Sequence, residues 1–271
     1  EFVNKTASRG QDIIFLMIGG EGRESPLWIG RHDIQLVKYA QMFGAHLFDL
    51  EHRFFGDSQP IPNMKTDSLR LLTTQQALAD LAYFIDSMNK QYNFDQPKWV
   101  TFGGSYPGAL SAFFRSKYPE LTVGAVASSA PVNLALDFYD YAGVIQAVMD
   151  RSPVTSDKKC SELTRDAFNT MSMLATTTEG RKQLSDTLHL APPFDANGIA
   201  TKADVNNFFA NIFNIFQGMT QYTYDGKSNT SKYDATVQKM CDILSTSKNG
   251  AVDPVANIWD LIAWYNKIFN G

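Results

Sequence analysis

The spacing of hydrophobic residues divides the chain into two parts. In the first part, short apolar runs alternate with segments whose apolar residues recur every three or four positions. The short runs predict β-strands because they are rich in β-branched and aromatic residues and are bounded by glycine or polar residues. They cover residues 12–18, 45–50, 98–102 and 123–127. The first run is almost wholly apolar, which predicts a central strand buried on both faces.

Helices are predicted between these strands by the helical spacing of apolar residues. They cover residues 33–43, 73–92 and the segment that follows residue 106. Thr73 and Gln76 have the spacing of a capping box at the start of the second helix. Residues 57–67 contain two prolines and predict a loop. The alternation of strand and helix predicts an α/β fold with a doubly wound, largely parallel sheet.

The second part of the chain has a different character. Residues 134–271 show no convincing strand pattern and are rich in Phe, Met, Tyr and Asn. We therefore expect residues 1–133 to be the N-terminal part of an α/β domain and residues 134–271 to be an all-helical cap domain. Helices are predicted over residues 138–150, 157–175, 179–188, 201–217, 232–246 and 253–269. The aromatic-rich segment 206–219 is expected to be core of this domain rather than a cofactor site.

Composition and charge exclude several classes of function. The chain has 271 residues, of which 44% are hydrophobic and 19% charged, as in ordinary globular proteins. A net charge of -4 and the lack of a basic cluster argue against nucleic-acid binding, and no apolar run is long enough to span a membrane. No His/Cys/Asp cluster has metal-ligand spacing. We expect no metal or other cofactor, and a homodimer is left open.

The strongest candidate for chemistry is Ser105. The predicted strand 98–102 ends in Gly103 and Gly104, and Ser105 then leads into a predicted helix. A strand, a glycine turn with a central serine and a helix form the layout of the G-x-S-x-G nucleophile elbow. The fit is imperfect, because the last glycine comes one residue late, at Gly108. The alternative interpretation is a structural glycine-rich turn that contains a serine by chance.

The cysteines and the glycosylation signals indicate in which cellular compartment the protein is found. Cys160 and Cys241 lie 81 positions apart (241 minus 160), which fits neither a CxxC metal site nor a redox motif. From the sequence they could form one disulfide or remain buried free thiols. Asn-x-Ser/Thr signals at Asn4 and Asn229 predict glycosylation and favour a secreted or lysosomal protein.

Several motifs together resemble one family of peptidases. FLMIGGEG, LEHRFFGDSQP, LTTQQALADLAYFI and TFGGSYPG occur in this order. The combination resembles the serine peptidases of the lysosomal prolyl carboxypeptidase, dipeptidyl peptidase II and thymus-specific serine protease type. The family pattern Gly-Gly-Ser-Tyr-x-Gly matches residues 103–108 at every fixed position and accounts for the late glycine. The likeness is strong over residues 12–131 and weaker over 134–271.

The resemblance implies an α/β-hydrolase fold and a peptide substrate. It implies a serine exopeptidase that cleaves near a chain terminus, after proline or a small residue, through an acyl-enzyme on Ser105. It does not separate the carboxypeptidase from the dipeptidyl-peptidase mode. It also implies that the second part is a helical insertion with disulfides, which makes Cys160 and Cys241 a pair.

The resemblance further suggests residues that build the site. The Tyr106 N–H would supply one oxyanion donor, and the glycine turn after the first strand, with the Gly20 N–H as the candidate, would supply the other. The remaining candidates shape the site. They are Gly19, Glu21, Gly104, Glu51 and His52.

The general base is the missing part of this assignment. In α/β-hydrolases the chain order is nucleophile, acid, histidine, and His189 is the only one of four histidines that follows Ser105. The family places the acid and the histidine after the cap, so we expect a C-terminally incomplete member that is nearly inactive alone. His189 as the base is the alternative. His52, between Glu51 and Arg53, is expected to be a structural histidine in a polar network.

Two other functions remain open from the sequence. An esterase or lipase would use the same elbow on the same fold. A protein of a different class would be a non-catalytic binding protein built on a hydrolase scaffold.

Overall fold

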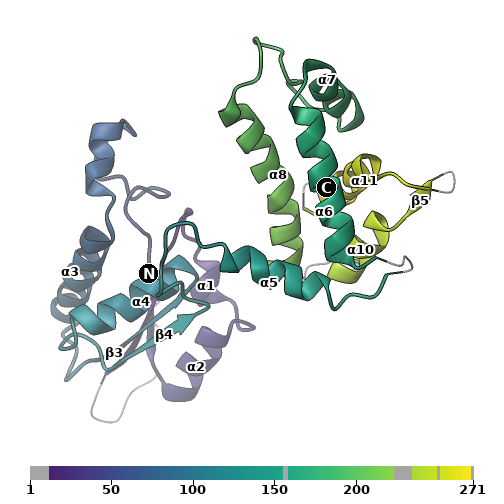
Figure 1. Ribbon diagram of the computed structural model, residues 1–271. Coiled ribbons are helices and arrows are strands. Elements are labelled where there is room, and N and C mark those ends of the chain that lie inside the picture. Colours follow the sequence, from purple (N-terminus) through teal and green to yellow (C-terminus); the bar gives the residue numbers. More distant parts are fainter. Residues whose placement is uncertain (1–11, 155–157, 223–233, 249–250, 270–271) are drawn as a thin grey trace. The chain divides into compact units, whose positions relative to one another are not determined.

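A computed structural model describes residues 12–154, 158–222, 234–248 and 251–269 (Figure 1). The chain divides into two compact units, residues 1–136 and 137–271, which we describe separately. This division lies close to the expected domain boundary, and the cap role of the second unit stays a prediction. The predicted glycosylation positions Asn4 and Asn229 lie outside the described residues.

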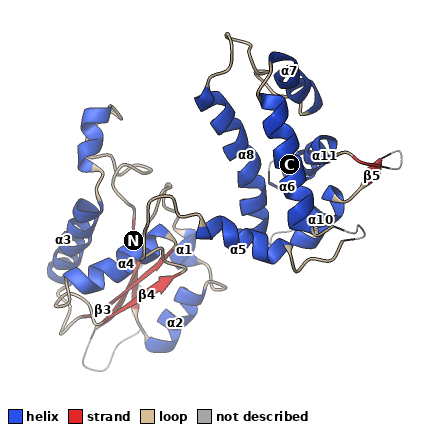
Figure 2. Cartoon of the chain, in the orientation of Figure 1, coloured by secondary structure: helices blue, strands red, loops and turns tan. Residues whose placement is uncertain are grey.

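The first unit is built on a parallel sheet of four strands in the order β2-β1-β3-β4. Figure 2 shows strands of this sheet in red, with β3 and β4 labelled. The strands are β1 (Ile13–Ile18), β2 (His46–Leu50), β3 (Lys98–Gly104) and β4 (Gly124–Ser128). β1 lies between β2 and β3, as its apolar sequence predicted. β4 is an edge strand in the part of the chain that the structure describes. The predicted parallel sheet is confirmed.

Helices cover both faces of this sheet. They are α1 (Leu27–Gly30), α2 (Gln35–Phe43), α3 (Thr74–Tyr92) and α4 (Tyr106–Lys117), with a 3₁₀ helix, η1 (Thr66–Leu71). One hydrophobic cluster joins Leu16 of β1 to α3 and α4, and a second joins Phe15 to α1 and α2. Successive strand residues point to opposite faces, so one strand supplies both clusters. This is the doubly wound arrangement that the alternation predicted.

Two details of these helices differ from the sequence predictions. α1 was not predicted, and η1 overlaps the end of the segment predicted as a loop; both are too short for helical periodicity to mark them. At the start of α3, Thr73 Oγ1 accepts the Gln76 N–H at 3.3 Å, which is half of the predicted capping box. The Gln76 side chain accepts a hydrogen bond from Arg53 instead of reaching back to Thr73.

The second unit is a bundle of helices, and all six predicted helices are confirmed. They are α5 (Asp140–Met149), α6 (Cys160–Ala175), α7 (Thr178–Thr187), α8 (Lys202–Gln221), α10 (Val237–Leu244) and α11 (Pro254–Phe269). The expectation of an all-helical unit was wrong in one detail. β5 (Ser247–Lys248) and β6 (Ala251–Val252) form a short antiparallel pair, and strands of two residues carry no readable periodicity.

The core of the second unit contains the disulfide that the resemblance implied. Cys160 at the start of α6 and Cys241 in α10 are bonded and fully buried. Phe208 and Phe216 of the aromatic-rich segment lie in the same core, as expected. In the part of the chain that the structure describes, no helix combines the length and hydrophobicity needed to cross a membrane.

Candidate active site

Ser105 occupies a strained turn between β3 and α4. Its φ of 60° and ψ of -128° lie outside the regions that residues with a side chain prefer. Its N–H donates to the Ser128 carbonyl at the end of β4 (2.9 Å), and its carbonyl accepts the Ala109 N–H in α4 (3.0 Å). The neighbouring elements therefore hold the strained residue from both sides, while its side chain is exposed. This is the geometry of a nucleophile elbow.

At two positions of the elbow, neighbouring atoms leave room only for glycine. A Cβ atom at position 103 would lie 2.2 Å from the Pro107 carbonyl oxygen, and one at position 108 would lie 2.9 Å from the Ser128 carbonyl oxygen. Gly108 therefore stands where the first turn of α4 passes the end of β4. At Gly104 the nearest atom would be 4.0 Å away, so this glycine is not required by space.

The glycine turn after β1 lies against the start of α4. A Cβ atom on Gly20 would lie 2.7 Å from Pro107 Cγ, which places Gly20 beside the elbow. Among the described residues, no group accepts a hydrogen bond from the Gly20 N–H or from the Tyr106 N–H, the first of α4. The structure thus places Gly20 beside Pro107, the residue after Tyr106, and the oxyanion role of the two N–H groups stays a prediction. Exposed Glu21 lies close enough that its charge helps to raise the pKa of Tyr106, after the larger effect of burial.

His52 is buried and uses both ring nitrogens. Nδ1 lies 2.8 Å from the Arg53 carbonyl oxygen, and Nε2 lies 3.0 Å from the Tyr106 hydroxyl oxygen. A carbonyl oxygen only accepts, so Nδ1 carries the proton and Nε2 accepts from the hydroxyl of Tyr106. Burial raises the pKa of Tyr106, which keeps this donor protonated. The geometry is that of a structural histidine that fixes Tyr106, the residue after Ser105.

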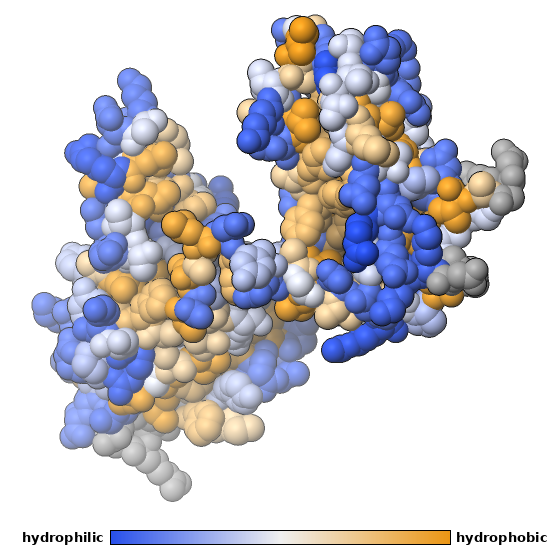
Figure 3. All heavy atoms as spheres, viewed as in Figure 1, coloured by the Kyte–Doolittle hydropathy of each residue, from blue (hydrophilic) through white to orange (hydrophobic). Residues whose placement is uncertain are grey.

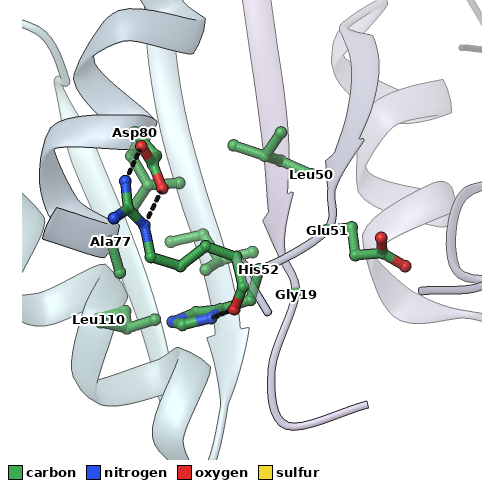
Figure 4. Close-up of a pocket in the computed structure, with 10 residues that line it drawn as sticks. Gly19, Leu50, Glu51, His52, Ala77, Asp80 and Leu110 are labelled. Carbon is green, nitrogen blue, oxygen red and sulfur yellow. Dashed lines mark hydrogen bonds and ion pairs between the residues drawn. The ribbon is translucent and has the colours of Figure 1, made fainter. Parts of the chain in front are cut away.

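Arg53 ties the loop after β2 to α3. Its Nε and Nη2 atoms donate to the two carboxylate oxygens of Asp80 at 2.6 and 2.5 Å (Figure 4). Its Nη1 atom donates to the Leu71 carbonyl oxygen. Such a two-point pair fixes orientation as well as distance. A cavity of about 20 Å³, room for about one water molecule, lies among these side chains. Its lining includes Gly19, His52, Arg53, Ala77, Asp80 and Leu110.

Glu51 organises its own loop and points away from His52 (Figure 4). Its carboxylate accepts the N–H groups of Glu24 (2.9 Å), Asp57 (2.8 Å) and Ser58 (2.7 Å). Desolvation acts to raise the pKa of Glu51, but these hydrogen bonds outweigh it and the pKa is lowered. Glu51 therefore remains an anion that closes the loop.

The other three histidines contact other residues. His32 pairs with Gln41, and His46 lies 3.6 Å from Asp12. His189 belongs to the second unit, where its ring lies 4.4 Å from the ring of Trp259. Within the described ranges no side chain hydrogen-bonds to the Ser105 hydroxyl, and no group of three His, Cys, Asp or Glu residues could hold a metal ion.

The site also contains residues that the sequence reasoning missed. Asp80 is one, because its partner Arg53 lies in a distant segment. Asp49 and Glu24 form a second pair beneath the glycine turn. The sequence contained a signal for Asp49, because it is the one acidic residue in the mostly apolar segment AHLFDL.

Together, the parallel sheet and the strained serine between β3 and α4 define an α/β-hydrolase, which confirms the predicted fold class. Residues 1–270 match the model of the family described as Serine carboxypeptidase S28. The chain belongs to this family of serine peptidases, and the resemblance drawn from the motifs is confirmed.

Individual relatives support the same assignment. A putative serine protease, F56F10.1 of Caenorhabditis elegans, is 58% identical over 267 residues, which are 98% of this chain and 48% of that protein. Human thymus-specific serine protease is 37% identical over 170 residues, covering 62% of this chain and 32% of that protein. Mouse lysosomal Pro-X carboxypeptidase is 33% identical over 202 residues, covering 73% of this chain and 40% of that protein. The chain spans about half the length of these relatives or less.

A solved structure gives a weaker match. Proline iminopeptidase of Mycobacterium smegmatis is similar with a TM-score of 0.42 at 13% identity, covering 83% of this chain and 65% of that chain. A likeness of this size carries no argument about fold or function.

Proposed function

We propose that this chain carries the nucleophile and the oxyanion hole of a serine exopeptidase that cleaves after proline or another small residue near a chain terminus. The observation that carries the proposal is the strained, exposed Ser105 between β3 and α4. Nucleophile elbows hold a serine in this way so that its hydroxyl projects from the sheet towards a substrate.

In the proposed reaction, Ser105 Oγ attacks the scissile carbonyl carbon and its proton passes to a general base. The negative charge that develops on the carbonyl oxygen would be held by the N–H groups of Tyr106 and Gly20. The carbon–nitrogen bond then breaks, the amine leaves with the proton, and an acyl-enzyme on Ser105 remains. A water molecule, activated by the same base, hydrolyses the acyl-enzyme and restores the serine.

The base and its acid are proposed to come from sequence beyond residue 271. The relatives are about twice as long as this chain, and no described histidine hydrogen-bonds to Ser105. β4 offers a place for further parallel strands, because an edge strand presents unpaired backbone groups. Val123 and Val126 at this edge are 54% and 40% exposed, and hydrophobic residues gather on the face where β4 lies (Figure 3).

The proposed substrate class and compartment follow from the relatives. One relative is named a lysosomal Pro-X carboxypeptidase, and the family is described as serine carboxypeptidases. These names favour a carboxypeptidase over a dipeptidyl peptidase. The Cys160–Cys241 disulfide fits an oxidising compartment, so we propose a lysosomal or secreted protein.

The test compares two versions of the protein on peptides with a penultimate proline. The full-length protein encoded by the complete transcript should release the terminal residue, and Ser105→Ala should reduce the rate by several orders of magnitude. The 271-residue chain alone should show almost no turnover. Turnover by this chain that Ser105→Ala abolishes would contradict the proposed origin of the base.

An esterase on the same elbow is the competing activity. Hydrolysis of acyl esters with no cleavage of prolyl peptides by the full-length protein would favour it. If neither substrate class is cleaved, the scaffold is a binding protein. Matched assays with Ser105→Ala separate these outcomes from hydrolysis by contaminants.

A further inference from the structure

Three carboxyl groups gather beneath the glycine turn that follows β1. Asp49, in β2, hydrogen-bonds through its side chain to the side chain of Glu24. The backbone N–H of Glu24 donates to the Glu51 carboxylate at 2.9 Å. The second oxygen of Asp49, Oδ1, is buried and has no partner among the described residues. Within the described ranges, acidic side chains are therefore in contact here, and no Lys or Arg side chain forms an ion pair with Asp49 or Glu24.

The Glu24 carboxyl also supports the backbone of the turn. A Cβ atom on Gly19 would lie 2.6 Å from Glu24 Oε2, so the carboxyl fills the space that a side chain at position 19 would take. The Gly19 N–H donates to the Leu50 carbonyl oxygen at 2.9 Å. The next residue, Gly20, packs against Pro107 beside Ser105. The carboxyl pair is thus connected to the proposed oxyanion donor through one residue of backbone.

Among the described residues, few positive charges lie near the pair, and the charge of the chain's terminal ammonium, a smaller effect than burial, acts to lower the pKa of Asp49. On β1 the neighbouring residue is Met17, α1 has no charged residue, and α2 buries Leu36, Val37 and Ala40 against this face. Two nearby cations are engaged elsewhere, Arg23 with Asp57 and Arg53 with Asp80. Lys38 of α2 is exposed, and Glu51 adds a fixed negative charge.

Two carboxyl groups can hydrogen-bond to each other only while at least one keeps its proton. Burial, followed by the charge and hydrogen bond of Glu24 and the charge of Glu51, raises the pKa of Asp49 to about 8. Burial also raises the pKa of Glu24. Because the groups are coupled, the proton belongs to the pair, with Asp49 as its main carrier.

We propose that Glu24 and Asp49 are positioning residues that hold the Gly19–Gly22 turn, and with it the Gly20 N–H, by sharing one proton. This inference rests on the proposed oxyanion role of Gly20. Loss of the shared proton leaves two like charges in contact, which pushes Glu24 away from Gly19 and loosens the turn. The site would then work in acid and near neutrality and lose its donor in alkali.

The direction of the stability change follows from the raised pKa. Below the unfolded pKa of Asp49, 3.8, both states hold the proton and its contribution to stability is fully present. Between that value and about 8 the unfolded chain loses the proton first, so the stability contribution declines as pH rises. The free energy of unfolding of wild type relative to that of Asp49→Asn should therefore decrease as pH rises from 3.8 to about 8, and it should stay constant at higher pH.

The direct experiment follows carboxyl ¹³C shifts by NMR in the full-length protein from pH 4 to pH 10. We expect one carboxyl to titrate with a midpoint near 8, and its transition to be absent in Asp49→Asn and shifted in Glu24→Gln. Asp57→Asn is the matched control, because Asp57 lies in the same region but pairs with Arg23 at the surface. If every carboxyl of the wild type titrates below about pH 6, the proposal is overturned.

A second measurement separates this inference from the proposed function. The rate of Ser105 labelling by a fluorophosphonate should fall above pH 8 in wild type and in Asp57→Asn, and hold to higher pH in Asp49→Asn. If the NMR transition is found but labelling falls alike in all three proteins, the pair shares a proton without positioning the turn, and the proposal fails. If Ser105 is never labelled, the proposed enzyme function fails. The NMR titration then still shows whether Asp49 and Glu24 share a proton.

Discussion

His52 Nε2 accepts a hydrogen bond from the hydroxyl group of Tyr106 at 3.0 Å. This bond links the loop after β2 to the first residue of α4. The two residues lie 54 positions apart in the sequence. Tyr106 directly follows Ser105, the proposed nucleophile, so this bond fixes the helix start whose N–H is the proposed oxyanion donor. It also occupies the nitrogen that a general base would need.

Removing the hydroxyl tests this link. Tyr106→Phe leaves the buried Nε2 of His52 without its donor, which should cost about 1–3 kcal/mol of unfolding free energy. Urea denaturation measures the change. Tyr83→Phe is the control, since Tyr83 is 77% exposed, and it should change stability by less than about 0.5 kcal/mol. Equal stability of both variants would show that the bond contributes nothing.

The three glycines of the elbow should differ in their tolerance of a methyl group. Gly103→Ala and Gly108→Ala force a Cβ atom against backbone oxygen or carbon and should each cost about 1–3 kcal/mol or more. Gly104→Ala has room and should be close to neutral. Thermal unfolding of the three variants decides the matter. A loss at position 104 as large as at 103 would contradict the elbow geometry.

Glu51 should control part of the stability in acid. Its lowered pKa means that its contribution is present above the ordinary glutamate pKa, 4.5, and is lost as pH falls through the folded-state value. Glu51→Gln should therefore be less stable than wild type at neutral pH, and the difference should shrink in acid. Calorimetry at several pH values measures this. Glu120→Gln, at an exposed position, serves as the control for the loss of a carboxylate at the surface.

The disulfide should stabilise the second unit. It closes a loop with a sequence separation of 81, for which chain-entropy arguments give about 4.5 kcal/mol. The double variant Cys160→Ala/Cys241→Ala should melt at a lower temperature, followed by the circular dichroism of the helices. Reducing agent should lower the melting temperature of wild type but not of the variant. An unchanged wild-type melting temperature after complete reduction would contradict the prediction.

The sequence predicted those elements whose periodicity is long or whose motif is local. The apolar run of β1, the spacing along α3 and the pattern from Gly103 to Gly108 each depend on neighbouring residues only. The Gly-Gly-Ser-Tyr-x-Gly pattern predicted the elbow, and the structure supplies its steric reason at positions 103 and 108.

What the sequence could not predict depends on residues that meet through the fold. Gln76 has the spacing of a capping box, but Arg53 competes for its side chain. The contact between Asp49 and Glu24 joins β2 to the loop after β1, and no spacing along the chain predicts this contact. The β5–β6 pair has strands of two residues each, too short for any period to appear.

The central claim is that Ser105 is a catalytic nucleophile, and labelling by a fluorophosphonate probe tests it most directly. The full-length protein should be labelled at a single residue, which mass spectrometry should identify as Ser105, and Ser105→Ala should remain unlabelled. Ser128→Ala, which removes only the hydroxyl of the residue whose backbone carbonyl holds the elbow, should be labelled like wild type. Absence of labelling in the folded wild-type protein, or unchanged labelling of Ser105→Ala, would contradict the account.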